Sequence, residues 1–375
     1  MFRRSLLTPV VAALALSGLA ACSDDDSGSD SADGDGSASS SAAETEAGQA
    51  EEITWEKVTA PAECQCSDAS EYHYWIHQGD TDRVVFFLEG GGACFSAETC
   101  APGESATYST SLADDSPDGP GANGSVVDGG LLDLDNPDNP LAGASVVYVP
   151  YCTGDLHLGT TSHDYGNGVV VQHKGSVNAT TALDTLAEEF PDASEVIVLG
   201  QSAGSASAAL YGGLAADRFP DAQVTVLADA SAAYPGDEAL TTVVGGLWGI
   251  AAGLPDWPEA AGDPPTAWSL PGLFVQTAEH VPGIRLATIN TADDEVQRRF
   301  ADLIGFSGTP LVELIDGNTA QIESAGVELD TWVGAGTTHV VTARDELYEA
   351  EVGGTLLIDW ITDVVNGEDV EDVHV

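Results

Sequence analysis

Short apolar runs alternate with amphipathic stretches from residue 53 to the end of the chain. The runs, rich in β-branched residues, predict strands, and the stretches between the later runs have helical spacing. The predicted strands cover residues 72–77, 83–88, 145–149, 195–199, 224–228, 284–290 and 329–333. The predicted helices cover residues 176–190, 203–218, 294–304 and 355–365. Near-continuous apolar strands separated by helices indicate an α/β fold, with a mostly parallel sheet covered on both faces.

Two long stretches interrupt this alternation. Residues 101–140 are rich in Gly, Asp and Pro, and they predict an irregular insertion. Residues 239–281 are rich in Trp and Pro and predict cap helices, in which Trp248, Trp257 and Trp268 either line a substrate pocket or pack inside the cap. Since no second linker and no internal repeat is visible, we expect residues 52–375 to form one domain with these insertions.

The N-terminal segment predicts export of the protein. Residues 1–21 place Arg3 and Arg4 before an apolar stretch and hold no acidic residue, which is typical of a signal peptide. The stretch ends in Leu-Ala-Ala-Cys, which resembles a bacterial lipobox and implies a lipid on Cys22. Residues 22–51 are mainly Ser, Asp, Gly, Ala and Glu, and they predict a disordered acidic tether. We therefore expect a location on the extracytoplasmic face of the cell membrane, with the lipid as the anchor.

The charge balance restricts the possible partners. The 375 residues include 10 Lys and Arg against 61 Asp and Glu, a formal net charge of −51. Nucleic-acid binding requires a basic footprint, which this composition does not supply, so we expect no nucleic-acid partner.

Gly200-Gln201-Ser202-Ala203-Gly204 follows the predicted strand 195–199 and leads into a predicted helix. Strand, sharp glycine turn with a central serine, and helix is the nucleophile elbow of serine hydrolases. Side chains at Gly200 or Gly204 would collide with the neighbouring strand or helix. The turn lifts the Ser202 hydroxyl above the sheet, so we expect Ser202 to be a nucleophile.

A serine nucleophile needs a base, which in α/β-hydrolases follows the nucleophile and the acid along the chain. Three histidines follow Ser202. His339 comes after the predicted strand 329–333 and a loop of small residues, where a catalytic histidine belongs. His280 precedes its nearest strand and His374 is the penultimate residue, so His339 is the predicted base.

The acid that orients the base is expected after another strand. The predicted strand 284–290 leads into Thr-Ala-Asp-Asp-Glu, which offers Asp293 and Asp294. Either aspartate suits the position after a strand, and the other is expected to cap the next helix. Asp229, which follows the predicted strand 224–228, is the second-ranked candidate.

The reaction also needs backbone N–H groups aimed at the oxygen on which charge develops. The N–H group of Ala203, directly after the nucleophile, is one expected donor. The turn Gly90-Gly91-Gly92 follows the predicted strand 83–88 and lets the backbone approach a substrate without side chains in the way. The remaining donors are expected from this turn.

Three motifs taken together, in this order, resemble the pectin acetylesterase/Notum family of serine esterases. They are Leu-Glu-Gly-Gly-Gly-Ala-Cys-Phe at 88–95, Pro-Tyr-Cys-Thr-Gly-Asp at 150–155 and Gly-Gln-Ser-Ala-Gly at 200–204. The resemblance implies an α/β-hydrolase-like fold and ester hydrolysis without a metal or another cofactor. It implies a triad of Ser202, an aspartate and His339.

The resemblance also indicates which aspartate and which N–H donors to expect, where the order of strands and helices leaves more than one choice. The Asp-Glu-x-x-Gln-like pattern of the family matches residues 294–297, which favours Asp294 over its neighbour. The oxyanion donors of the family correspond to Gly91, Gly92 and Ala203. The chain departs from Notum-like members, which carry an aromatic pair where this sequence has Gly92-Ala93. This departure changes the expected pocket wall.

Beyond Cys22, the cysteines are Cys64, Cys66, Cys94, Cys100 and Cys152. They suit an oxidising compartment. We expect Cys94 to bridge Cys100 and pin the glycine turn, and Cys152 to pair with Cys66 or Cys64.

Asp155, His157, His163 and His173 form a polar cluster in the sequence. Loop hydrogen bonding near the mouth of the site is favoured for this cluster over a metal site.

These observations predict an extracytoplasmic serine carboxylester hydrolase that forms an acyl-enzyme. The favoured substrate is an acetylated polysaccharide or another small acyl ester. A lipid or protein-acyl ester is the alternative substrate, and a non-catalytic surface binding lipoprotein is the alternative class of protein.

Overall fold

The computed structural model describes residues 53–102, 107–112, 120 and 129–375. The predicted signal peptide, the lipidation site Cys22 and the acidic tether (residues 22–51) lie outside the described residues, as does part of the predicted insertion 101–140. Residues 50–375 form one compact unit. Among the described helices, none combines the length and the apolar character that crossing a bilayer requires.

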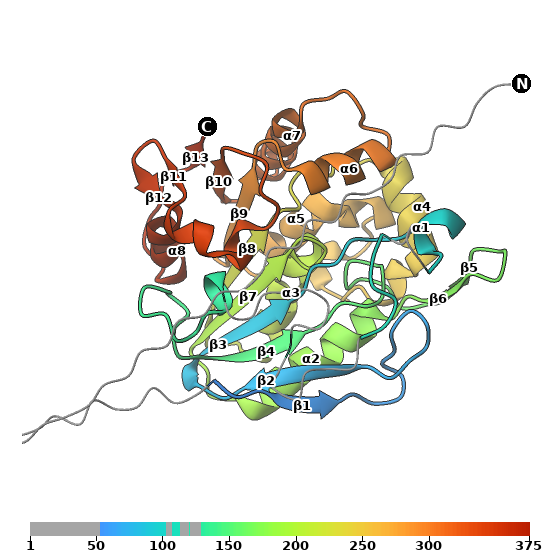
Figure 1. Ribbon diagram of the computed structural model, residues 1–375, viewed down its shortest axis with the longest axis horizontal. Helices are drawn as coiled ribbons and strands as arrows, with labels where there is room; N and C mark the ends of the chain where they lie inside the picture. Colours follow the sequence, from blue (N-terminus) through green and yellow to red (C-terminus); the bar gives the residue numbers. More distant parts are fainter. Residues whose placement is uncertain (1–52, 103–106, 113–119, 121–128) are drawn as a thin grey trace, which may run out of the picture. The chain divides into compact units, whose positions relative to one another are not determined.

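A nine-stranded sheet runs through this unit (Figure 1), in the order β1-β2-β4-β3-β7-β8-β9-β10-β13. Its strands are β1 (Glu56–Thr59), β2 (His73–His77), β3 (Asp80–Leu88), β4 (Ala144–Val149), β7 (Glu195–Gln201), β8 (Gln223–Asp229), β9 (Arg285–Thr291), β10 (Asp330–Gly334) and β13 (Val373–His374). Neighbours from β4 to β13 are parallel, whereas β1 and β2 add to the edge in antiparallel register. The predicted α/β fold with a mostly parallel sheet is therefore confirmed.

Helices cover both faces of the sheet (Figure 1). They are α1 (Ala97–Cys100), α2 (Gly175–Glu189), α3 (Ser205–Arg218), α4 (Glu238–Trp248), α5 (Leu270–His280), α6 (Glu295–Leu303), α7 (Leu311–Ser324) and α8 (Leu357–Val365). Alternate side chains of each central strand enter different cores. Phe86 of β3 lies in a cluster with residues of α2, α3 and α5, and Phe87 lies in a cluster with residues of α8.

Shorter elements complete the description. Two hairpins pair β5 (Ser162–Asp164) with β6 (Val170–Gln172) and β11 (Glu351–Val352) with β12 (Thr355–Leu356). The 3-10 turns are η1 (Gly130–Leu132), η2 (Ile250–Ala252), η3 (Pro258–Ala260), η4 (Pro265–Trp268), η5 (Val341–Ala343) and η6 (Asp345–Tyr348). The predicted cap stretch 239–281 therefore holds most of α4, η2 to η4, and α5.

Besides the two hairpins, the short helix α1 and the 3-10 turns, three elements were not predicted, namely β1, β13 and α7. The edge strand β1 is largely exposed and reads Glu-Lys-Val-Thr, which contains no apolar run that would predict a strand. Strand β13 has two residues and exists only because it pairs with β10. Helix α7 has the right apolar spacing at Leu311, Leu314 and Ile315, but Gly317 and Asn318 interrupt the pattern.

Two disulfides lie near the carboxyl ends of β3 and β4. Cys66 pairs with Cys152 and Cys94 pairs with Cys100. Cys64 keeps a buried free thiol, which donates to the Thr181 hydroxyl. Of the two partners considered for Cys152, the structure therefore selects Cys66, which joins the segment before β2 to the loop after β4.

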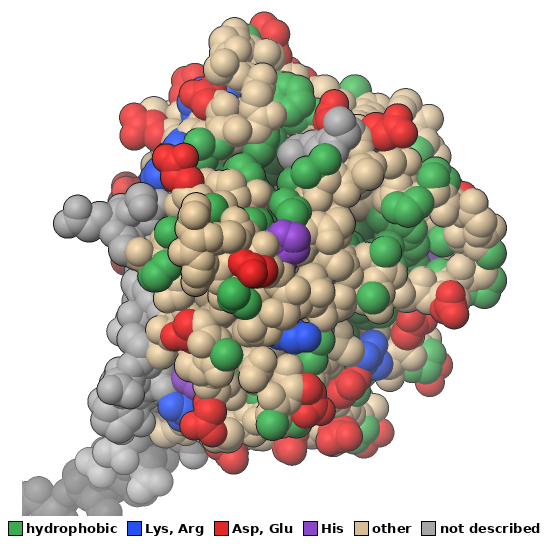
Figure 2. Space-filling view, turned by 90° about the vertical axis from the view of Figure 1, so that its right-hand side faces the viewer, with side chains coloured by type: hydrophobic (Ala, Val, Ile, Leu, Met, Phe, Trp, Pro, Cys, Tyr) green, Lys and Arg blue, Asp and Glu red, His purple; other side chains and the backbone are tan. Residues whose placement is uncertain are grey.

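Acidic side chains are spread over the face of the molecule shown in Figure 2, where basic side chains are few. This distribution agrees with the net charge of −51. Hydrophobic side chains gather in hollows on the same face.

Candidate active site

The turn between β7 and α3 brings Ser202 to the carboxyl edge of the sheet. Ser202 has a left-handed backbone with φ of 51°. A Cβ atom at Gly200 would lie 2.6 Å from the Gly204 carbonyl oxygen, and one at Gly204 would collide with the Leu88 carbonyl oxygen. Both glycines are therefore required by close backbone approach, as the sequence predicts for a nucleophile elbow.

A continuous line of hydrogen bonds joins three of the predicted residues. The Ser202 Oγ atom lies 2.8 Å from His339 Nε2, and His339 Nδ1 lies 2.7 Å from Asp294 Oδ2. Asp294 follows β9, and His339 follows β10, so parallel strands deliver all three side chains to one edge. When His339 donates its Nδ1–H to Asp294, its Nε2 lone pair is available to the Ser202 hydroxyl.

Asp294 combines two roles that the sequence assigns to two different aspartates. Its Oδ1 atom accepts the N–H groups of Val296 and Gln297 at 2.8 and 2.9 Å, which caps α6. Its Oδ2 atom faces His339. The neighbouring Asp293 is exposed and does not share this contact. The capping bonds hold the carboxylate in the orientation that the histidine needs.

Gln297 is a buried member of the site, and no role was predicted for it. Its side-chain N–H group donates to Asp294 Oδ2 and to Asn290 Oδ1, both at 3.2 Å. Its Oε1 atom accepts the Ala233 N–H group at 3.1 Å. The Asp-Glu-Val-Gln sequence at 294–297 contains this glutamine, so the spacing of three from Asp294 was the available signal.

The glycine turn after β3 lies against the nucleophile. A Cβ atom at Gly90 would lie 2.9 Å from the Ser202 Cβ atom. Gly92 has φ of 86°, a left-handed conformation that favours glycine. Within the described chain, the N–H groups of Gly91, Gly92 and Ala203 have no hydrogen-bond partner. These three donors are therefore available to an oxyanion beside Ser202.

Buried side chains hold this turn from behind. The Glu89 carboxylate accepts the Tyr151 N–H group at 2.6 Å, and His157 Nε2 lies 2.9 Å from the Glu89 carbonyl oxygen. The Tyr151 ring occupies the space where a Gly91 side chain would stand. Burial lowers the pKa of His157 to about 4, so a neutral ring donates its Nε2–H to the carbonyl at neutral pH.

The rest of the polar cluster is also engaged in loop contacts. Asp155 Oδ1 accepts the Thr153 hydroxyl and Oδ2 accepts the Gly175 N–H group, while His173 bonds the Thr153 carbonyl and the Tyr165 hydroxyl. His163 packs on the Tyr165 ring.

Potential metal ligands also come together beside this cluster. Among the described residues, Cys94, Cys100 and His173 place three potential ligand atoms within 4.8 Å of one another. Both cysteines are occupied in the disulfide.

Asp229, the second-ranked acid, connects the nucleophile to the histidine loop. Its carbonyl oxygen accepts the Ser202 N–H group at 2.8 Å. Its Oδ2 atom accepts both the N–H group and the hydroxyl of Thr342, each at 2.8 Å, and the Thr342 hydroxyl accepts the Gln201 side-chain N–H. The carboxylate thus holds the loop three residues after His339. Burial raises the pKa of Asp229 from 3.8 to about 6.

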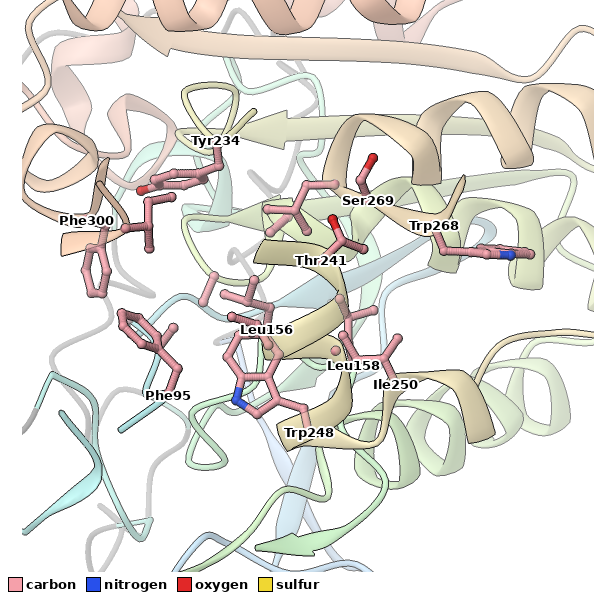
Figure 3. Close-up of a pocket in the computed structure, with 18 of the residues that line it drawn as sticks. Phe95, Leu156, Leu158, Tyr234, Thr241, Trp248, Ile250, Trp268, Ser269 and Phe300 are labelled. Atoms are coloured by element: carbon pink, nitrogen blue, oxygen red, sulfur yellow. The ribbon is translucent and has the colours of Figure 1, made fainter. Parts of the chain in front are cut away.

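An apolar pocket opens beside Ser202 (Figure 3). The cavity has a volume of about 120 Å³, and the space without atoms comes to about 880 Å³ when the open mouth and the solvent in it are included. In Figure 3 the rings of Phe95, Phe300 and Tyr234 lie towards one end, and Trp268 lies at the other. Leu156, Leu158, Val244, Trp248, Ile250 and Leu270 add apolar wall. Of the three cap tryptophans, Trp248 and Trp268 line the pocket, whereas Trp257 packs in the core against Trp268.

The two remaining downstream histidines make contacts of their own away from Ser202. His280 lies between Asp217 and Glu259, at 2.8 and 3.2 Å, and stacks on Trp257. His374 contacts Asp316. The structure therefore brings only His339, of the three histidines after the elbow, to the nucleophile.

We predict that Asp229→Asn changes the pH dependence of stability. A carboxylate whose pKa is about 6 in the folded state, against its ordinary value of 3.8, binds more protons when folded, so its contribution to stability falls as the pH rises from about 4 to about 6. Relative to wild type, Asp229→Asn is expected to gain roughly 2–3 kcal/mol of unfolding free energy between pH 4 and pH 7. Urea titrations at both pH values measure this, with exposed Asp293→Asn as control. A pH-independent difference contradicts the prediction.

Comparison with known proteins places the chain in a family. A family model described as Pectinacetylesterase matches residues 46–235, which include the glycine turn and Ser202. The inactive palmitoleoyl-protein carboxylesterase notum1b of Danio rerio is 32% identical over 116 residues, which are 30% of this chain and 76% of that protein. The Wnt deacylase Notum from Drosophila has a similar fold, with a TM-score of 0.61 at 17% identity over 84% of this chain and 93% of that chain. Since the family model spans just over half of the sequence, the chain belongs to the pectinacetylesterase family.

Proposed function

We propose that this protein is a serine carboxylester hydrolase whose catalytic residues are Ser202, His339 and Asp294. The observation that carries the proposal is the unbroken line from Ser202 Oγ through the His339 ring to Asp294 Oδ2, at 2.8 and 2.7 Å. An alcohol at neutral pH is a poor nucleophile, and a histidine held in this orientation removes its proton during attack.

The reaction then follows from the geometry. Ser202 Oγ attacks the ester carbonyl carbon while its proton passes to His339 Nε2, and Asp294 stabilises the imidazolium. Collapse of the tetrahedral intermediate breaks the bond to the alcohol, which takes the proton from His339 and leaves an acyl-enzyme. Water, deprotonated by His339, attacks the acyl carbon, and collapse of the second intermediate releases the acid and returns the proton to Ser202.

The oxyanion of each tetrahedral intermediate needs preorganised donors. We assign them to the N–H groups of Gly91, Gly92 and Ala203, which have no partner in the described chain. The left-handed backbone at Gly92 and the hydrogen bonds around Glu89 hold the turn before substrate arrives. Donors fixed in advance need little reorganisation when charge develops.

The pocket favours an ester with an apolar acyl chain. Its walls beside Ser202 are mainly aliphatic and aromatic side chains. A chain buried there is stabilised in proportion to the apolar area removed from water, whereas an acetyl group fills little of the space. We therefore place a lipid or protein-acyl ester first among the substrates. An acetyl ester of a polysaccharide is the second candidate, supported by the Pectinacetylesterase description of the matching family model.

The non-catalytic alternative also has a supporting observation, because the curated Danio rerio relative is described as inactive. The complete set of nucleophile, base, acid and free N–H donors in this chain supports the enzyme. A binding protein has no need for the strained serine and the aligned histidine.

We also propose that the protein is anchored by a lipid on Cys22 at the extracytoplasmic face of the membrane. The Leu-Ala-Ala-Cys sequence after an apolar stretch supports the anchor, and the two disulfides suit an oxidising compartment. Detergent phase partitioning of the protein from its native membrane tests this. Wild type is expected in the detergent phase and Cys22→Ser in the aqueous phase, and equal partitioning of the two contradicts the anchor.

We predict that Ser202→Ala abolishes both ester hydrolysis and labelling by a fluorophosphonate. Removal of a triad nucleophile lowers kcat by about 10⁴-fold or more. Exposed Ser194, at the other end of β7, provides the matched control, and Ser194→Ala is expected to hydrolyse p-nitrophenyl esters at the wild-type rate. Absence of labelling in wild type, or retained activity in Ser202→Ala, refutes the enzyme.

A further inference from the structure

Helix α4 forms one wall of the apolar pocket. Its pocket-lining residues are Thr241, Val244, Gly245 and Trp248, which are spaced three, four and seven residues from the first and so share one helical face. Trp248 is 3% exposed, and its indole N–H donates to the Cys94 carbonyl oxygen at 2.8 Å. The end of the helix is therefore fixed to the segment that follows the glycine turn.

Thr160 also holds the carboxyl end of α4. The Thr160 N–H group donates to the Trp248 carbonyl oxygen at 2.9 Å, and the Thr160 hydroxyl donates to the Gly249 carbonyl oxygen at 2.6 Å. With three hydrogen bonds at its carboxyl end, the pocket face of the helix has a defined orientation towards Ser202.

Gly245 leaves a gap on this face. A Cβ atom built at Gly245 has the Ile250 Cδ1 atom, at 3.9 Å, as its nearest neighbour, and Ile250 itself lines the pocket. No packing contact therefore requires glycine at this position. Glycine is a poor helix former, so neither packing nor helix stability favours glycine at this position.

The neighbouring Gly246 lies outside the pocket. It is exposed, does not line the cavity and has no atom within 4 Å of a built Cβ. Gly245 and Gly246 are therefore adjacent in the same helix, and a Cβ atom would clash with no other atom at either position. They differ in one property, which is whether a side chain would stand on the pocket wall.

We propose that Gly245 is a specificity-determining residue, whose missing side chain leaves room along α4 for an extended alkyl chain of the substrate. This inference rests on the proposed function, because it assumes that the acyl group of the ester lies in this pocket. A leucine at Gly245 would stand between Thr241 and Trp248 and occupy the space towards Ile250. We expect short acyl groups bound at Ser202 to leave that space empty.

The test is a binding measurement that needs no catalysis. Isothermal titration compares octanamide with butanamide on wild type, Gly245→Leu and Gly246→Leu. Neutral amides are used because a protein with a net charge of −51 repels carboxylates. Octanamide has four more methylenes than butanamide, and each buried methylene strengthens binding by about fourfold, so wild type and Gly246→Leu are expected to prefer octanamide by roughly 200-fold. In Gly245→Leu this preference is expected to disappear. A preference retained in Gly245→Leu, or absent from wild type, overturns the inference.

Two further measurements keep this result separate from misfolding and from the proposed reaction. Gly245→Ala adds one methyl group at a site with 3.9 Å of clearance, and it is expected to reduce the octanamide preference partially with the protein intact. The p-nitrophenyl octanoate to acetate ratio of kcat/KM is expected to fall in Gly245→Leu and to stay at the wild-type value in Gly246→Leu. Selective octanamide binding without ester hydrolysis in wild type refutes the proposed reaction and supports the role of Gly245.

Discussion

The strained backbone of Ser202 is the constraint on which the site depends. A left-handed conformation at a non-glycine residue costs about 1–3 kcal/mol and persists only where the surroundings enforce it. Here the Ser202 N–H group bonds to Asp229 on β8, and Gly204 packs against the end of β3. Ser202, at the end of β7, is thus held between β3 and β8, the two strands that flank β7 in the sheet. A side chain at Gly204 would collide with the end of β3, and one at Gly200 would collide with the Gly204 carbonyl group of the turn itself.

The other parts of the site are positioned by reference to this turn. Gly90 packs so closely on Ser202 that a side chain would not fit between them, which places the glycine turn beside the serine. The Asp229 carboxylate holds Thr342, and thereby the loop that carries His339. Asp294 is fixed independently, because it caps α6 as well as facing the histidine. Separate local contacts at the carboxyl ends of five strands, β3, β7, β8, β9 and β10, therefore converge on one place at the edge of the sheet.

Local patterns predicted the central strands, most helices and the placement of Ser202 and His339 at strand ends. Strand and helix periodicity and glycine turns are properties of a few adjacent residues, so one sequence suffices to detect them. Residues that act across the fold were not detectable in this way. Asp229 meets Thr342 from 113 positions away, and Trp248 meets Cys94 from 154 positions away. The double role of Asp294 was missed because a capping signal and a catalytic signal were treated as alternatives.

A crystal structure of the protein reacted with p-nitrophenyl octylphosphonate would show directly whether this edge of the sheet is an esterase site with an apolar acyl pocket. We expect phosphorus bonded to Ser202 Oγ, with the phosphoryl oxygen within hydrogen-bond distance of the N–H groups of Gly91, Gly92 and Ala203. We also expect the octyl chain in the pocket beside α4. A phosphonate on another residue, or a phosphoryl oxygen turned away from the glycine turn, would contradict the proposed esterase site.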